Sequence, residues 1–422
     1  MSFRVIIGGI KIQELKYRNR LKCKECGREF PPIKLYACEF CFGPLEVTYD
    51  LESFELNRES FINRPKTVWR YHDLLPVSNI EKIVDLGAGY TPLHKCDRLA
   101  DTLGLKTLFV KDDTVNPTGS FKDRPATVAV TKALEFGANA VGCASTGNLA
   151  AAVAAHAAKA GVPCYVFIPS DIEANKVLQA ATFGAKIISV KGTYDEVNRL
   201  ATQASEIFNW ALANIDTRPY YVEGSKTLGY EICEQLGWRA PDHIIVPTAS
   251  GALLCAIDRG LNEFQKLDLI NHKKTRMTAA QPLGCSPIAD AFKSNAAEIK
   301  PIEYPDTIAK SLAIGDPADG IYALKAIRNS GGEADSASNQ EILEAIQILG
   351  KNEGIFAEPA GGVTIAILKK LIDSGAITSD EEVVCCVTGS GFKATETILK
   401  SIPHPIEIEP TLKALKKKLK KK

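Results

Sequence analysis

Short runs of β-branched and other apolar residues recur along this chain from about residue 85, and they constrain its possible folds most. Six of them lie at residues 107–111, 140–144, 164–168, 186–190, 243–246 and 383–387. Alanine-rich stretches, such as 149–159 and 197–207, lie between them. Strands that are apolar on both faces and alternate with helices predict parallel sheets that helices cover on both sides. We therefore expect an α/β fold.

The chain has 422 residues, which is enough for two or three domains. Its beginning is rich in cysteine, the next segment is polar, and the α/β pattern follows. We predict an amino-terminal unit at 1–50, a connecting arm at 51–84, a large α/β domain formed by 85–130 and 205–405, a small α/β domain at 131–204, and a basic tail at 406–422.

The tail carries most of the basic character. Residues 413–422 contain seven lysines and no acid, whereas the whole chain has a net charge of only +1, so the remainder is net acidic. An acidic body argues against a nucleic-acid-binding protein. The tail could contact nucleic acid or an anionic membrane, but a solvated terminus is the interpretation we favour.

Neither a signal-peptide pattern nor an apolar run long enough to span a bilayer is evident in the sequence. We therefore expect a cytoplasmic protein that contacts neither membrane nor nucleic acid. Its twelve cysteines would be reduced thiols in that compartment.

Two Cys-x-x-Cys pairs lie in the amino-terminal unit: Cys23, Cys26, Cys38 and Cys41. Eleven residues separate the pairs, a spacing typical of a four-thiolate zinc site. Four ligands fill the tetrahedron and leave no position for catalysis, so we predict a structural zinc ribbon. Gly27 and Gly43 follow the pairs, where we expect positive φ. Redox disulfides, plain thiols and a nucleic-acid-binding ribbon are the alternatives.

Lys122 follows the first strand and a turn-rich loop with Asn116, Pro117 and Gly119. Ser120 could cap a helix beginning at Phe121, which would place Lys122 in the first helical turn. The positive end of the helix dipole would lower the pKa of its amine there, and a neutral amine is what Schiff-base formation requires. Taken alone, Lys122 would be interpreted as a solvated lysine rather than as a catalytic residue.

Three further loops follow strands and contain small residues, at 145–148, 247–253 and 388–391. Helix starts of this kind offer backbone N–H groups to a carboxylate or a phosphate. Open α/β sheets bind ligands at the carboxyl ends of their strands, where all three loops would lie. Together with Lys122, the loops indicate a ligand-binding site.

These segments carry a resemblance to a known family. Residues 120–124, 145–148 and 247–253 resemble the fold type II, or β-family, pyridoxal-phosphate enzymes. The match is closest to the threonine synthases of archaea and cyanobacteria, most specifically in 218–229, 280–288 and 309–315. The resemblance implies two open α/β domains with parallel sheets, a pyridoxal 5'-phosphate cofactor, a homodimer, and conversion of O-phospho-L-homoserine and water into L-threonine and phosphate.

The resemblance also implies roles for individual residues. Lys122 matches the lysine that holds the cofactor and carries protons, Asn148 the partner of the cofactor's phenolic oxygen, and Thr388 the partner of the ring nitrogen. The cofactor's phosphate would lie on a loop of five residues: Ala249, Ser250, Gly251, Ala252 and Leu253. Ser145 and Thr146 would bind the substrate carboxylate.

The residues that bind the substrate's phosphate are less well defined. The 249–253 loop lacks the asparagines that many threonine synthases have there, and Leu149 replaces a threonine found in some relatives. Arg218, Ser225 and Lys226 are our candidates.

Three alternatives stay open. A threonine or serine dehydratase and a cysteate synthase that uses phosphoserine and sulfite share the fold. Dehydratases lack the cysteine-rich start and the 218–229 segment. A zinc-ribbon binding protein on an inactive core is the non-enzyme alternative, and the presence of Lys122, Asn148 and Thr388 argues against it.

Overall fold

The computed structural model describes residues 6–7, 10–11, 19–170 and 177–419. Its large sheet has six strands in the order β14-β13-β12-β15-β7-β6. These are β6 (Leu93–Lys95), β7 (Thr107–Asp112), β12 (His243–Pro247), β13 (Arg276–Pro282), β14 (Ala334–Ala337) and β15 (Glu382–Val387). All neighbours pair in parallel except β6, which is an antiparallel edge strand.

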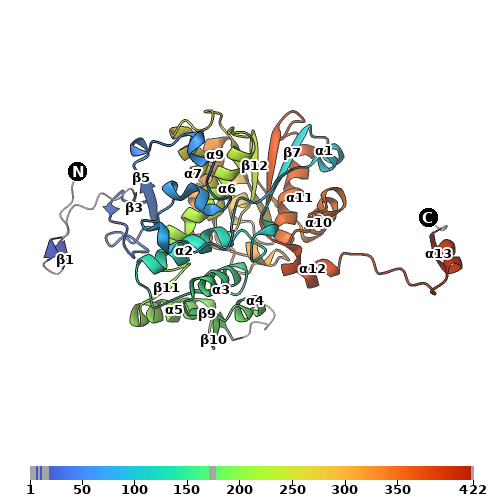
Figure 1. The fold of residues 1–422 in the computed structure, drawn as a ribbon. Coiled ribbons are helices and arrows are strands. Elements are labelled where there is room, and N and C mark those ends of the chain that lie inside the picture. The colour runs from blue at the N-terminus through green and yellow to red at the C-terminus, as the bar shows by residue number, and fades with distance from the viewer. Residues whose placement is uncertain (1–5, 8–9, 12–18, 171–176, 420–422) are drawn as a thin grey trace.

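Helices cover both faces of the large sheet (Figure 1). On one face pack α1 (Asp97–Leu103), α10 (Asn339–Glu353) and α11 (Pro359–Asp373). On the other face pack α6 (Arg218–Gln235), α7 (Ala252–Lys266), α8 (Pro287–Lys293) and α9 (Gly320–Ser330). Strand β15 is apolar throughout because both of its faces are buried. Val383 and Cys385 enter the core on the α1–α10–α11 face, and Val384 and Cys386 enter the core on the opposite face. The short helix α12 (Thr395–Leu399) follows this strand.

The small sheet has four parallel strands in the order β10-β9-β8-β11. They are β8 (Ala140–Ala144), β9 (Cys164–Pro169), β10 (Lys186–Val190) and β11 (Trp210–Leu212). Helices α2 (Asp123–Glu135), α3 (Asn148–Ala160) and α4 (Leu178–Thr182) share one core with it, and α5 (Tyr194–Phe208) covers its other face. The predicted boundary at residue 204 was wrong, because β11 pairs with β8 and keeps the chain in this sheet as far as Leu212.

The amino-terminal unit forms an antiparallel sheet of β3 (Asn19–Cys23), β4 (Glu29–Phe30) and β5 (Leu45–Tyr49). Strand β1 (Ile6–Ile7) pairs separately with β2 (Ile10–Lys11), also antiparallel. The three-stranded unit packs on α6. Tyr220 donates its hydroxyl to the Ile33 carbonyl at 2.6 Å, and Tyr49 donates to a carboxylate oxygen of Glu223 at 2.7 Å.

The carboxyl-terminal segment extends away from the body and ends in α13 (Leu412–Leu419), which has no buried residue (Figure 1). A solvated tail was the interpretation favoured from its composition. Among the helices that the structure describes, none is long and apolar enough to cross a membrane.

Candidate active site

The loop that carries Lys122 is joined to the loop after β15. The Phe121 amide donates to the Thr388 carbonyl at 2.9 Å, and the Ser390 amide donates to the Gly119 carbonyl at 2.9 Å. Ser120 and Gly389 form a β-bridge between them. These backbone contacts place Lys122 beside Thr388, as expected for two loops at the carboxyl edge of neighbouring strands.

Helix α2 begins at Asp123, so the prediction that Ser120 caps a helix starting at Phe121 was wrong. Ser120 lies in the bridge with Gly389 instead, and its buried hydroxyl has no hydrogen-bond partner among the described residues. The Asp123 carboxylate holds the loop, because it accepts hydrogen bonds from the amide and the hydroxyl of Thr118 at 2.8 and 2.9 Å. Lys122 thus immediately precedes the helix.

The Lys122 amine lies in largely apolar surroundings. Its Nζ is 4.4 Å from the centre of the Phe121 ring and 5.9 Å from that of Tyr221. Burial lowers the pKa of Lys122 to about 8, and the charge of Glu358 partly opposes this change. About a tenth of such amines are neutral at pH 7. The direction agrees with the prediction, but burial rather than the helix dipole is the main cause.

Glu358 is a site residue that the sequence did not reveal. It precedes α11 and is 6% exposed, and the Asn148 side-chain amide donates to its two oxygens at 3.2 and 3.4 Å. Burial raises the pKa of Glu358, whereas the Asn148 hydrogen bond and the charges of Lys393 and Lys122 act to lower it. Glu358 therefore bonds to Asn148 and acts on Lys122 through its charge. A glutamate before Pro359 resembles an ordinary helix start, and no local pattern shows what it faces.

The predicted phosphate loop turns from β12 into the start of α7. Gly251 has a φ of +91°, and a Cβ there would lie 2.8 Å from the Asp319 carbonyl oxygen, so both conformation and space require glycine. The first N–H groups of a 15-residue helix have no partner within the helix, and they favour an anion. This arrangement fits a phosphate group.

Comparison with known proteins defines the family. A family model described as "Pyridoxal-phosphate dependent enzyme" matches residues 84–389. The chain belongs to this family of pyridoxal-phosphate-dependent enzymes. It is 42% identical to the threonine synthase of Methanocaldococcus jannaschii, over 94% of this chain and 99% of that protein. It is 43% identical to the threonine synthase of Methanosarcina acetivorans, over 94% and 97% respectively.

Solved structures agree with this assignment at the level of the fold. Diaminopropionate ammonia lyase from Escherichia coli gives a TM-score of 0.63 at 18% identity, covering 76% of this enzyme and 91% of that chain. Maize serine racemase gives 0.60 at 22% identity, covering 74% and 93%. The predicted family and the predicted α/β fold with parallel sheets are thus confirmed.

The two residues predicted to bind the substrate carboxylate follow β8. Ser145 and Thr146 are half-buried and directly precede Gly147 and α3, whose first residue is Asn148. Asn148 contacts Glu358 from this position, so the loop and the Lys122 segment border the same site of the enzyme.

The three residues predicted to bind the substrate phosphate lie in different environments. Arg218 begins α6, is paired with Asp319 at 2.9 Å, and lines a cavity of about 200 Å³ between the amino-terminal unit and α7. Ser225 is buried within α6. Lys226 is fully buried between Glu223, at 2.7 Å, and Glu263, at 3.0 Å. A phosphate-binding role does not fit the position of Lys226, since two carboxylates already neutralise its amine.

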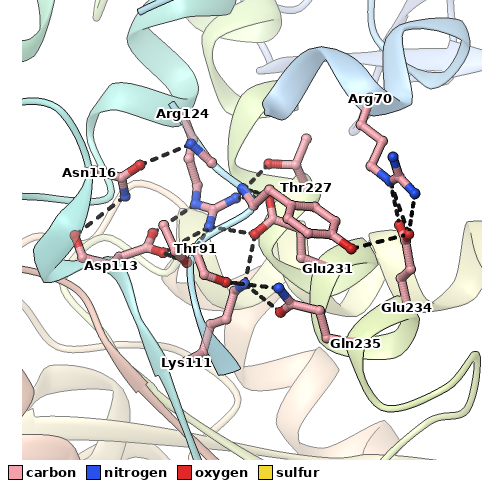
Figure 2. A network of polar contacts seen from close by, with 12 residues as sticks. Arg70, Thr91, Lys111, Asp113, Asn116, Arg124, Thr227, Glu231, Glu234 and Gln235 are labelled. Carbon is pink, nitrogen blue, oxygen red and sulfur yellow. Dashed lines mark hydrogen bonds and ion pairs between the residues drawn. The ribbon is translucent and has the colours of Figure 1, made fainter. Parts of the chain in front are cut away.

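A buried network of charges fixes the start of α2 (Figure 2). Arg124, two residues after Lys122, is fully buried and donates to both oxygens of Asp113, at 2.7 and 2.8 Å. It also donates to both oxygens of Glu231, which pairs with Lys111 at 2.7 Å. Two cations and two carboxylates therefore balance. Their charges hold the pKa of Glu231 at about 2 despite its burial.

The four cysteines of the amino-terminal unit converge. All four sulfurs lie within 4.8 Å of one another, with Cys23 and Cys41 3.5 Å apart and Cys26 and Cys38 3.7 Å apart. A tetrahedral ion with Zn–S bonds of about 2.3 Å separates its sulfurs by about 3.8 Å. The geometry therefore fits a metal ion.

The glycines after the two pairs differ. Gly27 has the expected positive φ of +71°, but after the second pair Phe42 has a φ of +58° and Gly43 does not. Gly43 serves a different purpose, because a Cβ there would lie 3.1 Å from the Cys23 sulfur.

Proposed function

We propose that the enzyme is a threonine synthase, which converts O-phospho-L-homoserine and water into L-threonine and inorganic phosphate. The observation that carries the proposal is the identity of 42–43% to two archaeal threonine synthases over nearly the full length of both chains. The positions of Lys122, Asn148 and Thr388 at one edge of two sheets support it.

In this proposal Lys122 transfers protons, and Ser145 and Thr146 bind the substrate. Pyridoxal phosphate, when bound, draws electrons away from the substrate Cα. Lys122 holds the cofactor, and its released amine removes the Cα proton and moves protons at Cβ. A pKa near 8 suits both steps, because the amine can accept and return a proton near neutral pH. Ser145, Thr146 and the adjacent N–H groups bind the substrate carboxylate.

Asn148 and Thr388 contact the cofactor ring. A side-chain amide has two N–H groups, so Asn148 can donate one to Glu358 and the other to the cofactor's phenolic oxygen. Thr388 offers the ring nitrogen a hydroxyl, which stabilises a positive ring nitrogen less than a carboxylate would. The residues from Ala249 to Leu253 hold the cofactor's phosphate through their backbone N–H groups.

The cysteine cluster holds a structural zinc ion in this proposal. The sulfur separations support it, and four thiolates leave no open position for catalysis. The homodimer that the resemblance implies stays a prediction, which the molar mass in solution would test.

Spectroscopy combined with product analysis tests the main proposal. The purified enzyme should absorb in the visible region through its cofactor and form equal amounts of threonine and phosphate from O-phosphohomoserine. Lys122→Ala should lose both properties. Lys106→Ala is the matched control, since this exposed lysine pairs with Asp380 at the surface. Activity with phosphoserine and sulfite alone would identify a cysteate synthase, and deamination of threonine alone would identify a dehydratase.

A further inference from the structure

Lys393 lies beside the site and has no part in the mechanism above. It ends a short 3-10 helix, Gly391–Lys393, five residues after Thr388. Its amide donates to the Ser390 carbonyl at 3.0 Å, and the Ser390 amide donates to Gly119. The side chain runs close to Gly119, where an added Cβ would lie 3.3 Å from the Lys393 Cε. Backbone hydrogen bonds therefore connect the loop that carries Lys122 to the segment that carries Lys393.

The amine of Lys393 faces several charged groups but pairs directly with none of the described carboxylates. Its Nζ donates to the side-chain oxygen of Gln179 at 2.6 Å. Burial lowers the pKa of Lys393, and the more distant charges of Glu358 and Asp123 act to raise it. No ion pair within 4.0 Å joins Lys393 to a carboxylate in the part of the chain that the structure describes. Its charge is therefore available to an incoming anion.

Other cations near the site are already neutralised. Arg124 is bonded to two buried carboxylates, Lys226 lies between two more, and Arg218 is paired with Asp319. Releasing Arg124 would leave Asp113, and releasing Lys226 would leave Glu263, as a buried carboxylate without its cation, which is strongly unfavourable. Arg218 shares Asp319 with Lys24. Lys122 is required for the cofactor. Among the described residues, Lys393 is the remaining cation of this set, and it has no carboxylate within 4.0 Å.

We propose that Lys393 binds the phosphate group of the substrate, an inference that rests on the proposed function. A phosphate monoester carries between about −1.5 and −2 charges at pH 7 and has three acceptor oxygens. An ammonium group has three N–H donors, so Lys393 can keep Gln179 and still donate to phosphate.

Gln179 adds a positioning role to this proposal. It lies on α4, which packs with the small sheet, whereas Lys393 follows β15 of the large sheet. Its own side-chain amide donates to the Thr118 carbonyl at 3.3 Å. Gln179 therefore orients the lysine across the two sheets, and phosphate bound to Lys393 lies between them.

Inhibition by inorganic phosphate tests the proposal. We expect Lys393→Ala to keep the cofactor absorption but to raise both the KM for O-phosphohomoserine and the inhibition constant of phosphate by about 10- to 100-fold, the value of a charged hydrogen bond. The concentration of L-threonine that half-saturates the cofactor's spectral change should stay the same, because threonine carries no phosphate. The exposed Lys400→Ala should match wild type in all three measurements.

If the inhibition constant of phosphate is unchanged in Lys393→Ala, the inference about Lys393 is overturned. The proposed function still stands in that case, provided that the wild-type enzyme forms threonine. No threonine formation by wild type would instead refute the proposed function. If Lys393→Ala does not fold, Gln179→Glu provides the second test, because it places a carboxylate against the amine. It should weaken phosphate inhibition to a similar degree, and wild-type inhibition in that variant would also overturn the inference.

Discussion

Replacing Glu231 by glutamine tests whether charge balance in the buried network stabilises the enzyme. The substitution keeps the shape of the side chain, but Asp113 is then the one carboxylate left to balance Arg124 and Lys111 within this network of described residues (Figure 2). The network lowers the pKa of Glu231 from 4.5 to about 2, which corresponds to about 3 kcal/mol. Removing one member of a buried ion pair costs about 3–5 kcal/mol in general. We expect the variant to lose a similar free energy of unfolding.

Urea unfolding followed by tryptophan fluorescence measures this loss. The folded-state pKa of Glu231 lies below its unfolded value, so its contribution is present above pH 4.5 and is lost as the pH falls toward 2. The difference between wild type and Glu231→Gln should therefore be constant near neutral pH and narrow in acid. Asp380→Asn removes the charge of an exposed partner of Lys106 and should leave the free energy of unfolding nearly unchanged.

A double variant makes the test specific to charge. Glu231→Gln combined with Lys111→Met leaves one cation, Arg124, with one carboxylate, Asp113. This variant should be more stable than Glu231→Gln alone. A loss below about 1 kcal/mol in the single variant, or no recovery in the double variant, would refute the reasoning.

Schiff-base formation between cofactor-free enzyme and added pyridoxal phosphate should accelerate as the pH rises through about 8, where Lys122 loses its proton. Glu358→Gln should shift this dependence of the rate on pH to lower pH, because the charge of Glu358 raises the pKa of Lys122. Gly251→Ala should raise the dissociation constant of the cofactor about tenfold or more, because Gly251 has a φ of +91° and an added Cβ would meet Asp319. Gly375→Ala is the control: Gly375 has a φ of +75° but lies in open space, so the substitution should not affect cofactor binding. Cys38→Ser should reduce the zinc content measured by elemental analysis, whereas Cys285→Ser, a buried cysteine elsewhere, should not, and equal zinc in both would contradict the zinc site.

Much of the fold could be predicted from local sequence. The six predicted strands are all present, because each is an apolar run whose alternate residues enter two cores, as in β15. Strand β14 (Ala334–Ala337) is short and contains Asp335 and Ser336, so its sequence has no such pattern. Strand β11 has only three residues, which is why the domain boundary was misplaced.

Local sequence patterns mark only part of the candidate site. The loops at Asn148, Gly251 and Thr388 follow strands and contain small residues, and this combination is visible in sequence. Glu358 and Lys393 are defined by contacts with residues about 210 positions away in the chain. The ion pair of Lys226 with Glu263 could not be predicted for the same reason, since Glu263 lies on a different helix.

The amino-terminal unit also shields buried side chains of the large domain from water. Tyr49 donates to Glu223, and its ring lies 4.1 Å from the Lys226 amine, so one strand of the unit closes a group of buried charges on α6 and α7. Removing this unit would admit water to Glu223, Lys226 and Glu263. The amino-terminal unit therefore cannot be replaced as an independent domain. A chain that lacks it would need other residues to bury that face of α6.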